Sequence, residues 1–125
     1  MVAYPQSPVL ALQAATPAAG FALQNGTPTI LTWTAPNDGN LHRFAIYGNT
    51  VITSTETGGA IHITWTPPTA GSSTSAGTDS GGTAAGIKNW TVVTGIVAAG
   101  TTVTLSQSSA LTAGAATAFA EIWGS

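Results

Sequence analysis

The chain has 125 residues, a net charge of −2 and no cysteine, and 5% of its residues are Asp, Glu, Lys or Arg, against about 25% in an ordinary soluble domain. The length indicates one domain with room for a core, and the missing cysteines exclude a disulfide framework and a thiolate metal site. Two basic residues cannot neutralise a run of phosphates, so we expect no nucleic-acid partner. No apolar run reaches the roughly 18 residues of a membrane span, so we expect no membrane association.

Residues 1–18 are uncharged and contain three prolines. Prolines at this density disfavour a helix and favour an extended N-terminal arm. An apolar extended arm either supplies an edge strand to its own domain or lies across a partner. The apolar side chains of the arm that we expect at an interface are Tyr4, Val9, Leu10 and Leu12.

Residues 19–125 form the predicted domain, in which short runs of Thr, Val, Ile and Trp alternate with Gly, Pro, Asn and Asp, as in strands joined by turns. In "TILTWT" the alternation places Leu31 and Trp33 on one face and threonines on the other. The turn sequence "NDGN" then predicts a hairpin. Its second strand, "LHRFAIYG", is expected to point Phe44 and Ile46 inward.

The later part of the chain repeats this pattern. In "AIHITWTPP" Ile61, Ile63 and Trp65 share one face, and the proline pair ends the strand. The further expected strands, with the residues that mark their apolar sides, are 88–96, 101–107 with Val103 and Leu105, and 115–123 with Phe119 and Trp123. About seven or eight such strands predict an all-β fold, a two-sheet antiparallel β-sandwich with jelly-roll-like or immunoglobulin-like topology.

The stretch 69–86 contains no large apolar residue before Ile87, which predicts a flexible surface loop. It includes "TDSGG", the pattern around the nucleophile of trypsin-like proteases. A serine nucleophile needs a base and an oriented third group, and a flexible Ser80 has no fixed geometry relative to His42 or His62. We therefore predict that Ser80 solubilises the loop and that the protein is not an enzyme; a small hydrolase that uses His42 or His62 remains as a third hypothesis.

Other reactive sites are not indicated by the spacing of the polar residues. The possible metal ligands lack zinc-site spacing, and Ile87 takes the lysine position of a phosphate loop in "GGTAAGIK", so we predict no metal and no cofactor. Paired carboxylates, as in glycosidases, are open to the acidic residues, but no pattern in the sequence selects such a pair. The possible ligands and acids are Asp38, His42, Glu56, His62, Asp79 and Glu121.

Four tryptophans divide into two groups. Trp33 and Trp65 alternate with threonine, so we expect them in the core. Exposed tryptophans stack on sugars or anchor interfaces. Trp90 and Trp123 are expected to contact a partner, and Glu121, two residues before Trp123, is expected at the rim of that contact.

Two resemblances add to these inferences. "LTWTAPNDG" and "ITWTPP" resemble the second strand of fibronectin type III domains, and "LTAGAATAF" is similar to that family's L-x-P-G-x-x-Y-x-F segment, with Ala113 and Thr117 in place of its proline and tyrosine. The chain as a whole, with "LQNGTPTILTWTAPNDGNLHRFAIYG", "ETGGAIHITWTPP" and "AFAEIWGS", resembles small virion proteins of tailed bacteriophages, in particular capsid decoration proteins. That resemblance implies a compact β-domain, commonly a homotrimer, on the outer capsid surface of a virion assembled in the host cytoplasm, where it clamps neighbouring copies of the major capsid protein.

The first hypothesis is therefore a capsid decoration or cement protein that acts as a homo-oligomer. A nearly uncharged surface suits this role, because many weak contacts on a lattice add up to tight attachment. The alternative is a carbohydrate-binding or adhesive module of a tail fibre or surface protein, which would use exposed aromatic side chains.

Overall fold

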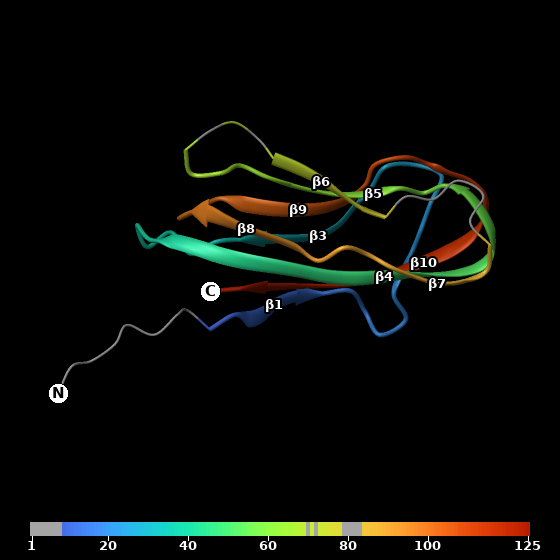
Figure 1. Cartoon of the computed structure of the whole chain (residues 1–125), viewed down its shortest axis with the longest axis horizontal. Helices are drawn as coiled ribbons and strands as arrows, with labels where there is room; N and C mark the ends of the chain where they lie inside the picture. Colours follow the sequence, from blue (N-terminus) through green and yellow to red (C-terminus); the bar gives the residue numbers. More distant parts are fainter. Residues whose placement is uncertain (1–8, 70, 72, 79–83) are drawn as a thin grey trace.

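The computed structural model of the chain describes residues 9–69, 71, 73–78 and 84–125. These residues form ten β-strands and no helix, and the strands make two antiparallel sheets that pack face to face (Figure 1). The predicted all-β, two-sheet sandwich is confirmed.

We name the two sheets A and B. In sheet A, β10 and β4 pair with each other at the centre. On its other edge β10 pairs with β1 and β2. On its other edge β4 pairs with β7 and β8. In sheet B the order is β3-β9-β5-β6. The strands of sheet A are β1 (Ala11–Ala15), β2 (Phe21–Ala22), β4 (Leu41–Gly58), β7 (Gly86–Asn89), β8 (Val93–Ala98) and β10 (Leu111–Gly124). Those of sheet B are β3 (Thr29–Thr34), β5 (Ile61–Trp65), β6 (Ser73–Thr78) and β9 (Thr102–Gln107).

The pairing is nested, as in a long hairpin rolled up on itself. If β1 with β2 and β7 with β8 are each counted as one edge, the ten strands become eight, four in each sheet. The edge of β1 and β2 pairs with β10, the last strand, and β3 pairs with β9. Strand β4 pairs with the edge of β7 and β8, and β5 pairs with β6. This is the topology of a jelly roll, so of the two alternatives left open by the sequence the structure has the jelly roll.

The predicted hairpin of β3 and β4 is wrong, because these strands belong to different sheets. The "NDGN" turn carries the chain from sheet B to sheet A, so the apolar faces of the two strands meet across the core. The rings of Trp33 and His42 approach edge to face at 6.5 Å, and those of Phe44 and Trp65 at 5.3 Å. Packing between the sheets therefore uses the same inward-facing residues that the alternation predicts.

The predicted strand 88–96 is interrupted, and its interruption buries a tryptophan. Strand β7 ends at Asn89 and β8 begins at Val93. Between them the Trp90 main-chain N–H donates to the carbonyl of Gly48 at 3.0 Å, and its indole Nε1 donates to the hydroxyl of Thr50 at 3.0 Å. Trp90 is 7% exposed. The expectation that Trp90 contacts a partner is therefore wrong, because a bend in the chain turns its ring into the core.

Strand β10 turns its small residues to the core. The prediction that Phe119 and Trp123 mark its apolar side is wrong, since both lie half-buried on the opposite face. The buried positions of this strand are Ala116, Ala118, Ala120, Ile122 and Gly124. Small side chains here leave space for the large rings that enter the core from other strands.

Part of the predicted loop 69–86 is a strand. Residues 73–78 form β6, which pairs with β5 at the edge of sheet B. A β-ladder is held by main-chain hydrogen bonds, so this serine- and threonine-rich segment can pair without large apolar side chains. Asp79 and Ser80 lie outside the described residues.

The N-terminal arm contributes an edge strand to its own domain, one of the two alternatives above. Within it, β1 pairs antiparallel with the last part of β10, with Leu12 opposite Trp123. Thr16 continues this contact, because its main-chain N–H donates to Ala120 at 3.0 Å. Tyr4 lies outside the described residues.

Two glycines leave space that aromatic rings of the core occupy. A Cβ at Gly124 would lie 2.6 Å from the ring of Trp33. A Cβ at Gly48 would collide with the ring of Trp90 and approach the main-chain oxygen of Phe119 to 2.8 Å. These contacts indicate that a ring covers each glycine, an arrangement that compensates for the missing side chain in a strand.

We predict that Gly48→Ala lowers the free energy of unfolding by about 1–3 kcal/mol, as overpacking of a core does. The neighbouring main-chain oxygen cannot move aside as a side chain could. Urea denaturation measures the effect. Gly26→Ala is the matched control, because a Cβ at Gly26 has nothing within 4 Å; equal losses in the two variants would contradict the proposed packing.

Candidate interaction surface

The outer face of sheet B is covered with hydroxyl groups. Along β3, β5 and β9 the side chains that alternate with buried residues are polar, and the hydroxyls of Thr34 and Thr102 lie 2.8 Å apart across two strands. The outward residues are Thr32, Thr34, His62, Thr64, Thr102, Thr104 and Ser106. Water solvates such a face well, so it has little tendency to bind another protein surface.

The outer face of sheet A, by contrast, exposes large apolar side chains among its polar ones. Its strands turn these side chains outward at positions that alternate with the core residues of β4, β8 and β10. The exposed large apolar residues on it are Leu12, Leu41, Tyr47, Ile87 and Ile96. Val9 and Val92, which are also exposed, lie in segments that lead into strands of sheet A. The described large apolar residues with high exposure thus lie on this face or in the segments next to its strands.

Strand register brings the central residues of this face together. Tyr47 lies opposite Glu121, and Trp123 lies between Leu12 and Ala45. The Trp123 indole Nε1 donates to the Glu121 carboxylate at 2.9 Å, which fixes the ring on the face. A hollow of about 460 Å³ is lined by Tyr47, Glu121 and Trp123 together with Leu10, which lies just before β1.

Two more hollows flank this centre. One, of about 480 Å³, is lined by Leu10, Arg43, Phe44, Thr94, Gly95 and Ile96. The other, of about 400 Å³, lies toward the residues after β1, and its lining includes Thr16, Pro17, Tyr47, Asn49, Phe119 and Glu121. We name the outer side chains of sheet A with these hollows the sheet A face.

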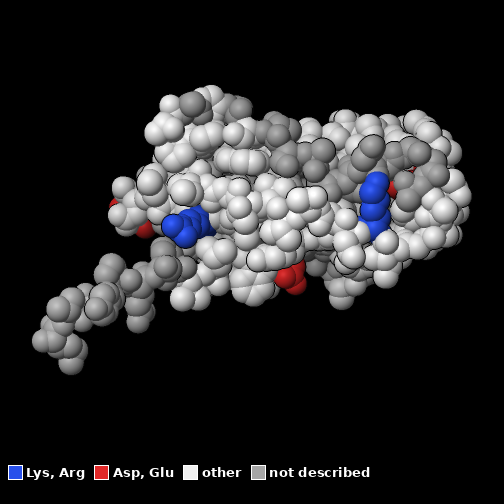
Figure 2. Space-filling model, viewed as in Figure 1, with Lys and Arg blue, Asp and Glu red and all other residues white. Residues whose placement is uncertain are grey.

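Charge is sparse on the sheet A face. Arg43 and Glu121 are the charged residues of the described chain whose side chains point from it, by their alternation with the buried residues of β4 and β10. Figure 2 shows one side of the molecule, which is almost entirely uncharged and carries only a few acidic and basic groups. A partner can therefore cover most of the sheet A face without removing a charge from water.

The structure places the predicted interface residues unequally. Leu10, Leu12 and Trp123 lie on the sheet A face, and Val9 is exposed just before it. The sequence did not single out three further residues of this face, Arg43, Tyr47 and Ile96. The signal was the same alternation that identifies the core, because Arg43 and Tyr47 are the outward neighbours of Phe44 and Ile46.

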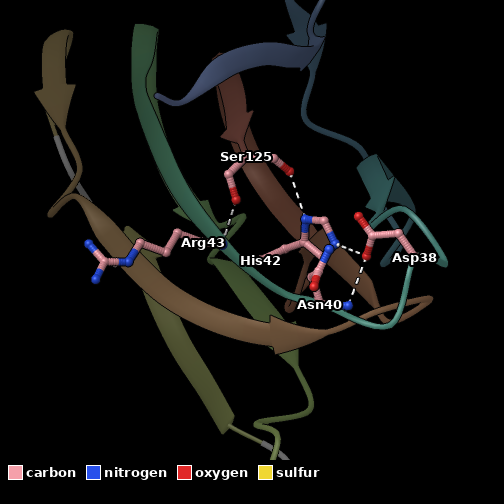
Figure 3. A network of polar contacts seen from close by, with 5 residues as sticks. All are labelled: Asp38, Asn40, His42, Arg43 and Ser125. Atoms are coloured by element: carbon pink, nitrogen blue, oxygen red, sulfur yellow. Dashed lines mark hydrogen bonds and ion pairs between the residues drawn. The ribbon is translucent and has the colours of Figure 1, made fainter. Parts of the chain in front are cut away.

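A cluster of polar groups surrounds His42 at one end of the sandwich (Figure 3). The His42 Nε2 lies 2.8 Å from the Asp38 carboxylate, and Nδ1 lies 2.8 Å from the main-chain oxygen of Ser125. Asp38 also accepts the main-chain N–H of Asn40 at 3.0 Å, and the main-chain N–H of Arg43 donates to the Ser125 hydroxyl at 2.9 Å. Since both ring nitrogens face acceptors, the ring binds best as an imidazolium that donates twice.

This arrangement, which we call the histidine clasp, differs from a catalytic triad although it joins Asp, His and Ser. The imidazole contacts the main-chain oxygen of Ser125, whereas the Ser125 hydroxyl accepts from a main-chain N–H. A triad requires a hydrogen bond from the nucleophile to the base, which the clasp does not contain. The other imidazole, His62, points from the outer face of sheet B. The clasp ties the "NDGN" turn to β4 and to the end of β10.

The clasp shifts the pKa of both its ionisable groups. The hydrogen bond to Asp38 raises the pKa of His42 above 6.5, with a smaller contribution from the Ser125 oxygen. The main-chain N–H of Asn40 and then the bond to His42 lower the pKa of Asp38 below 3.8. The stability due to protonated His42 is complete below pH 6.5 and is lost as the pH rises through the raised pKa of His42. The stability due to ionised Asp38 is present above pH 3.8 and is lost as the pH falls through the lowered pKa of Asp38.

We predict that His42→Gln lowers the midpoint of thermal unfolding most between pH 3.8 and pH 6.5. The difference from the wild type should shrink at higher pH, where the wild-type imidazolium loses its proton. Melting curves over a series of pH values measure this. His62→Gln removes an imidazole outside the clasp, so its difference from the wild type should not follow the same pH profile; identical profiles for the two variants would contradict the clasp.

Glu56 is buried without a hydrogen bond to its carboxyl oxygens in the described part of the chain. Its Oε2 lies beside Gly59, where the side chains of Leu23 and Leu111 also pack. Burial raises the pKa of the Glu56 carboxyl above 4.5, and the positive charge of Lys88 offsets part of this rise. Because the folded-state pKa is raised, folding loses stability as the pH rises from 4.5 through the raised value.

We predict that Glu56→Gln is more stable than the wild type at neutral pH and equally stable near pH 3, well below 4.5, where the wild-type carboxyl is protonated in both states. The glutamine keeps the shape of the side chain and removes the charge that burial disfavours. Urea denaturation at both pH values tests this. A Glu56→Gln variant that is less stable at neutral pH would show that the charge is compensated.

Other kinds of site are not formed by the residues that the structure describes. They contain no group of three or more His, Cys, Asp or Glu placed to hold a metal ion. No helix among them has the length and hydropathy for a membrane crossing. Comparisons of the chain with protein-family models, with curated proteins and with solved structures find no match.

Proposed function

We propose that this chain is a non-enzymatic structural protein of a virion, a capsid decoration or cement protein that binds the outer shell and stabilises neighbouring coat subunits. The observation that carries the proposal is the sheet A face, a broad, nearly uncharged surface that exposes large apolar side chains on one side of the sandwich. The histidine clasp supports a non-catalytic role, because its imidazole is already bound at both nitrogens.

The physical basis is cohesion through apolar contact. Covering apolar surface gains about 25 cal/mol per Å², and isolated apolar side chains are common on soluble proteins, whereas a continuous patch indicates an interaction site. Tyr47 is 46% exposed and Ile87 is 70% exposed, so both still have surface to bury. A shell presents the same contact many times, so each contact can be weak.

The jelly-roll fold is compatible with this role and does not prescribe it. Viral capsid domains and lectins both use the fold, and function depends on the surface that each protein builds on it. In this chain the long strands β4 and β10 provide a flat support for the sheet A face.

A carbohydrate-binding module is the second candidate, favoured by one of the hollows. The hollow of about 400 Å³ combines the rings of Tyr47 and Phe119 with the amide of Asn49 and the carboxylate of Glu121. Aromatic rings that stack on a sugar, with polar groups for its hydroxyls, are the usual elements of such a site. Trp123 donates to Glu121, so its fluorescence would report a bound sugar.

We predict that the protein sediments with empty capsid shells of its own phage and raises their melting temperature, because a ligand of the assembled shell stabilises it by mass action. A variant with Val51→Thr and Ile87→Thr, which lie opposite each other on the sheet A face, should bind more weakly. The matched control carries Thr32→Ser and Thr104→Ser on the outer face of sheet B and should bind like the wild type.

Two results would count against the decoration role. One is a folded protein that stays in the supernatant with the shells. The other is quenching of tryptophan fluorescence by neutral monosaccharides together with no change in shell stability, which would favour the carbohydrate-binding module.

A further inference from the structure

We propose that a second copy of this chain docks on the sheet A face, related by a two-fold axis that sets Arg43 of each copy against Glu121 of the other. The inference rests on the proposed function, because it takes the sheet A face to be the binding surface. It adds a second occupant of one end of that face, beside the coat subunit, and the pair of residues that fixes its orientation.

The two charged side chains of the face are too far apart to pair with each other, so both can pair with a second molecule. Arg43 is four residues before Tyr47 on β4, and Glu121 is opposite Tyr47 on β10. At about 3.4 Å per residue along a strand and about 4.8 Å between strands, their Cα atoms are roughly 14 Å apart. The described residues contain no ion pair that involves either side chain. Each therefore has its charge available to a second molecule.

One cation and one anion on the same face make that face complementary to itself. In a two-fold interface the same patch contributes from both subunits, so a contact between two different residues occurs twice. A two-fold axis in the plane between the faces, midway between Arg43 and Glu121, brings each charge to the opposite charge of the partner. A partner of uniform charge would instead leave one of these groups facing its own sign.

The same axis passes through the apolar centre of the face. Leu10 lies between the two charges, since it lines one hollow with Arg43 and another with Glu121, Tyr47 and Trp123. In the dimer, the apolar side chains near the axis in one copy contact the same side chains of the other copy. The contact then has an apolar middle and ion pairs toward its rim, the usual anatomy of a protein interface.

The part of the face that the pair covers is enough for a weak, concentration-dependent dimer. The axis crosses β4 near Ala45, so residues 41–49 of one copy lie over the same residues of the other. Nine residues at about 3.4 Å and four strands at about 4.8 Å span roughly 31 Å by 19 Å, or about 600 Å² on each copy, which is at the lower end of specific interfaces. The rest of the sheet A face, from residue 50 of β4 onward with β7, stays uncovered for a coat subunit.

The test is a charge exchange, measured by analytical ultracentrifugation of the purified full chain without shells. The wild type should sediment as a dimer. Arg43→Glu and Glu121→Arg should each weaken dimerisation by about 100-fold, because each dimer then contains two like-charged contacts worth about tenfold each. The double variant R43E/E121R restores opposite charges and should regain the wild-type dimer.

A matched pair of lysine substitutions locates the interface independently of these residues. Thr94 is exposed on the sheet A face beside Ala45, and Thr32 is exposed on the outer face of sheet B. Thr94→Lys should yield monomers, whereas Thr32→Lys should remain dimeric. Melting curves of every variant show whether it is folded, and the restoration by the double variant does not depend on either single variant being stable.

The outcomes separate this inference from the proposed function. A wild-type monomer at high concentration, a trimer, or a double variant as weak as the single ones would overturn the two-fold pair. If such a monomer still binds shells, the decoration role stands with a coat subunit on the sheet A face. A dimer that responds to the charge exchange and does not bind shells would leave the pair intact and overturn the decoration role.

Discussion

The packing of aromatic rings against small residues is the constraint on which the rest of this sandwich depends. Trp33 and Trp90 occupy space that Gly124 and Gly48 leave open, and the alanines of β10 continue this thin layer. Larger side chains at these positions would force the sheets apart. Because the small residues hold β10 flat against the rings, its other face is free to carry Phe119, Glu121 and Trp123.

One strand thus serves two purposes through its alternation. Its inward residues close the core, and its outward residues, with those of β4, form the sheet A face. Sheet B has the same alternation, but most of its outward side chains carry a hydroxyl group. The difference between the two sides of the molecule therefore lies entirely in the side chains, since both sheets have the same kind of backbone. The sheet A face is where the proposed pairing and the proposed attachment gain their free energy.

The sequence predicted the class of fold and the inward residues of β3, β4, β5 and β9, because alternation is a local property. It did not predict which strands pair: "NDGN" has the composition of a hairpin turn, although it joins two sheets. Trp90 was misplaced because nothing local shows that the chain bends between Asn89 and Val93. The histidine clasp was missed for a similar reason: Asp38 and His42 are near in sequence, but the Ser125 oxygen that completes the clasp comes from the far end of the chain.

The scarcity of charge on the sheet A face has a consequence for the conditions in which the protein works. Dissolved ions weaken contacts between exposed charges over a distance of about 10 Å at 0.1 M ionic strength, but they have little effect on apolar contact, which some salts even strengthen. On this face, Arg43 and Glu121 are the groups that dissolved ions can screen. The apolar part of the cohesion between such surfaces therefore stays nearly the same in dilute fresh water as in brine, whereas the ion pairs weaken in brine.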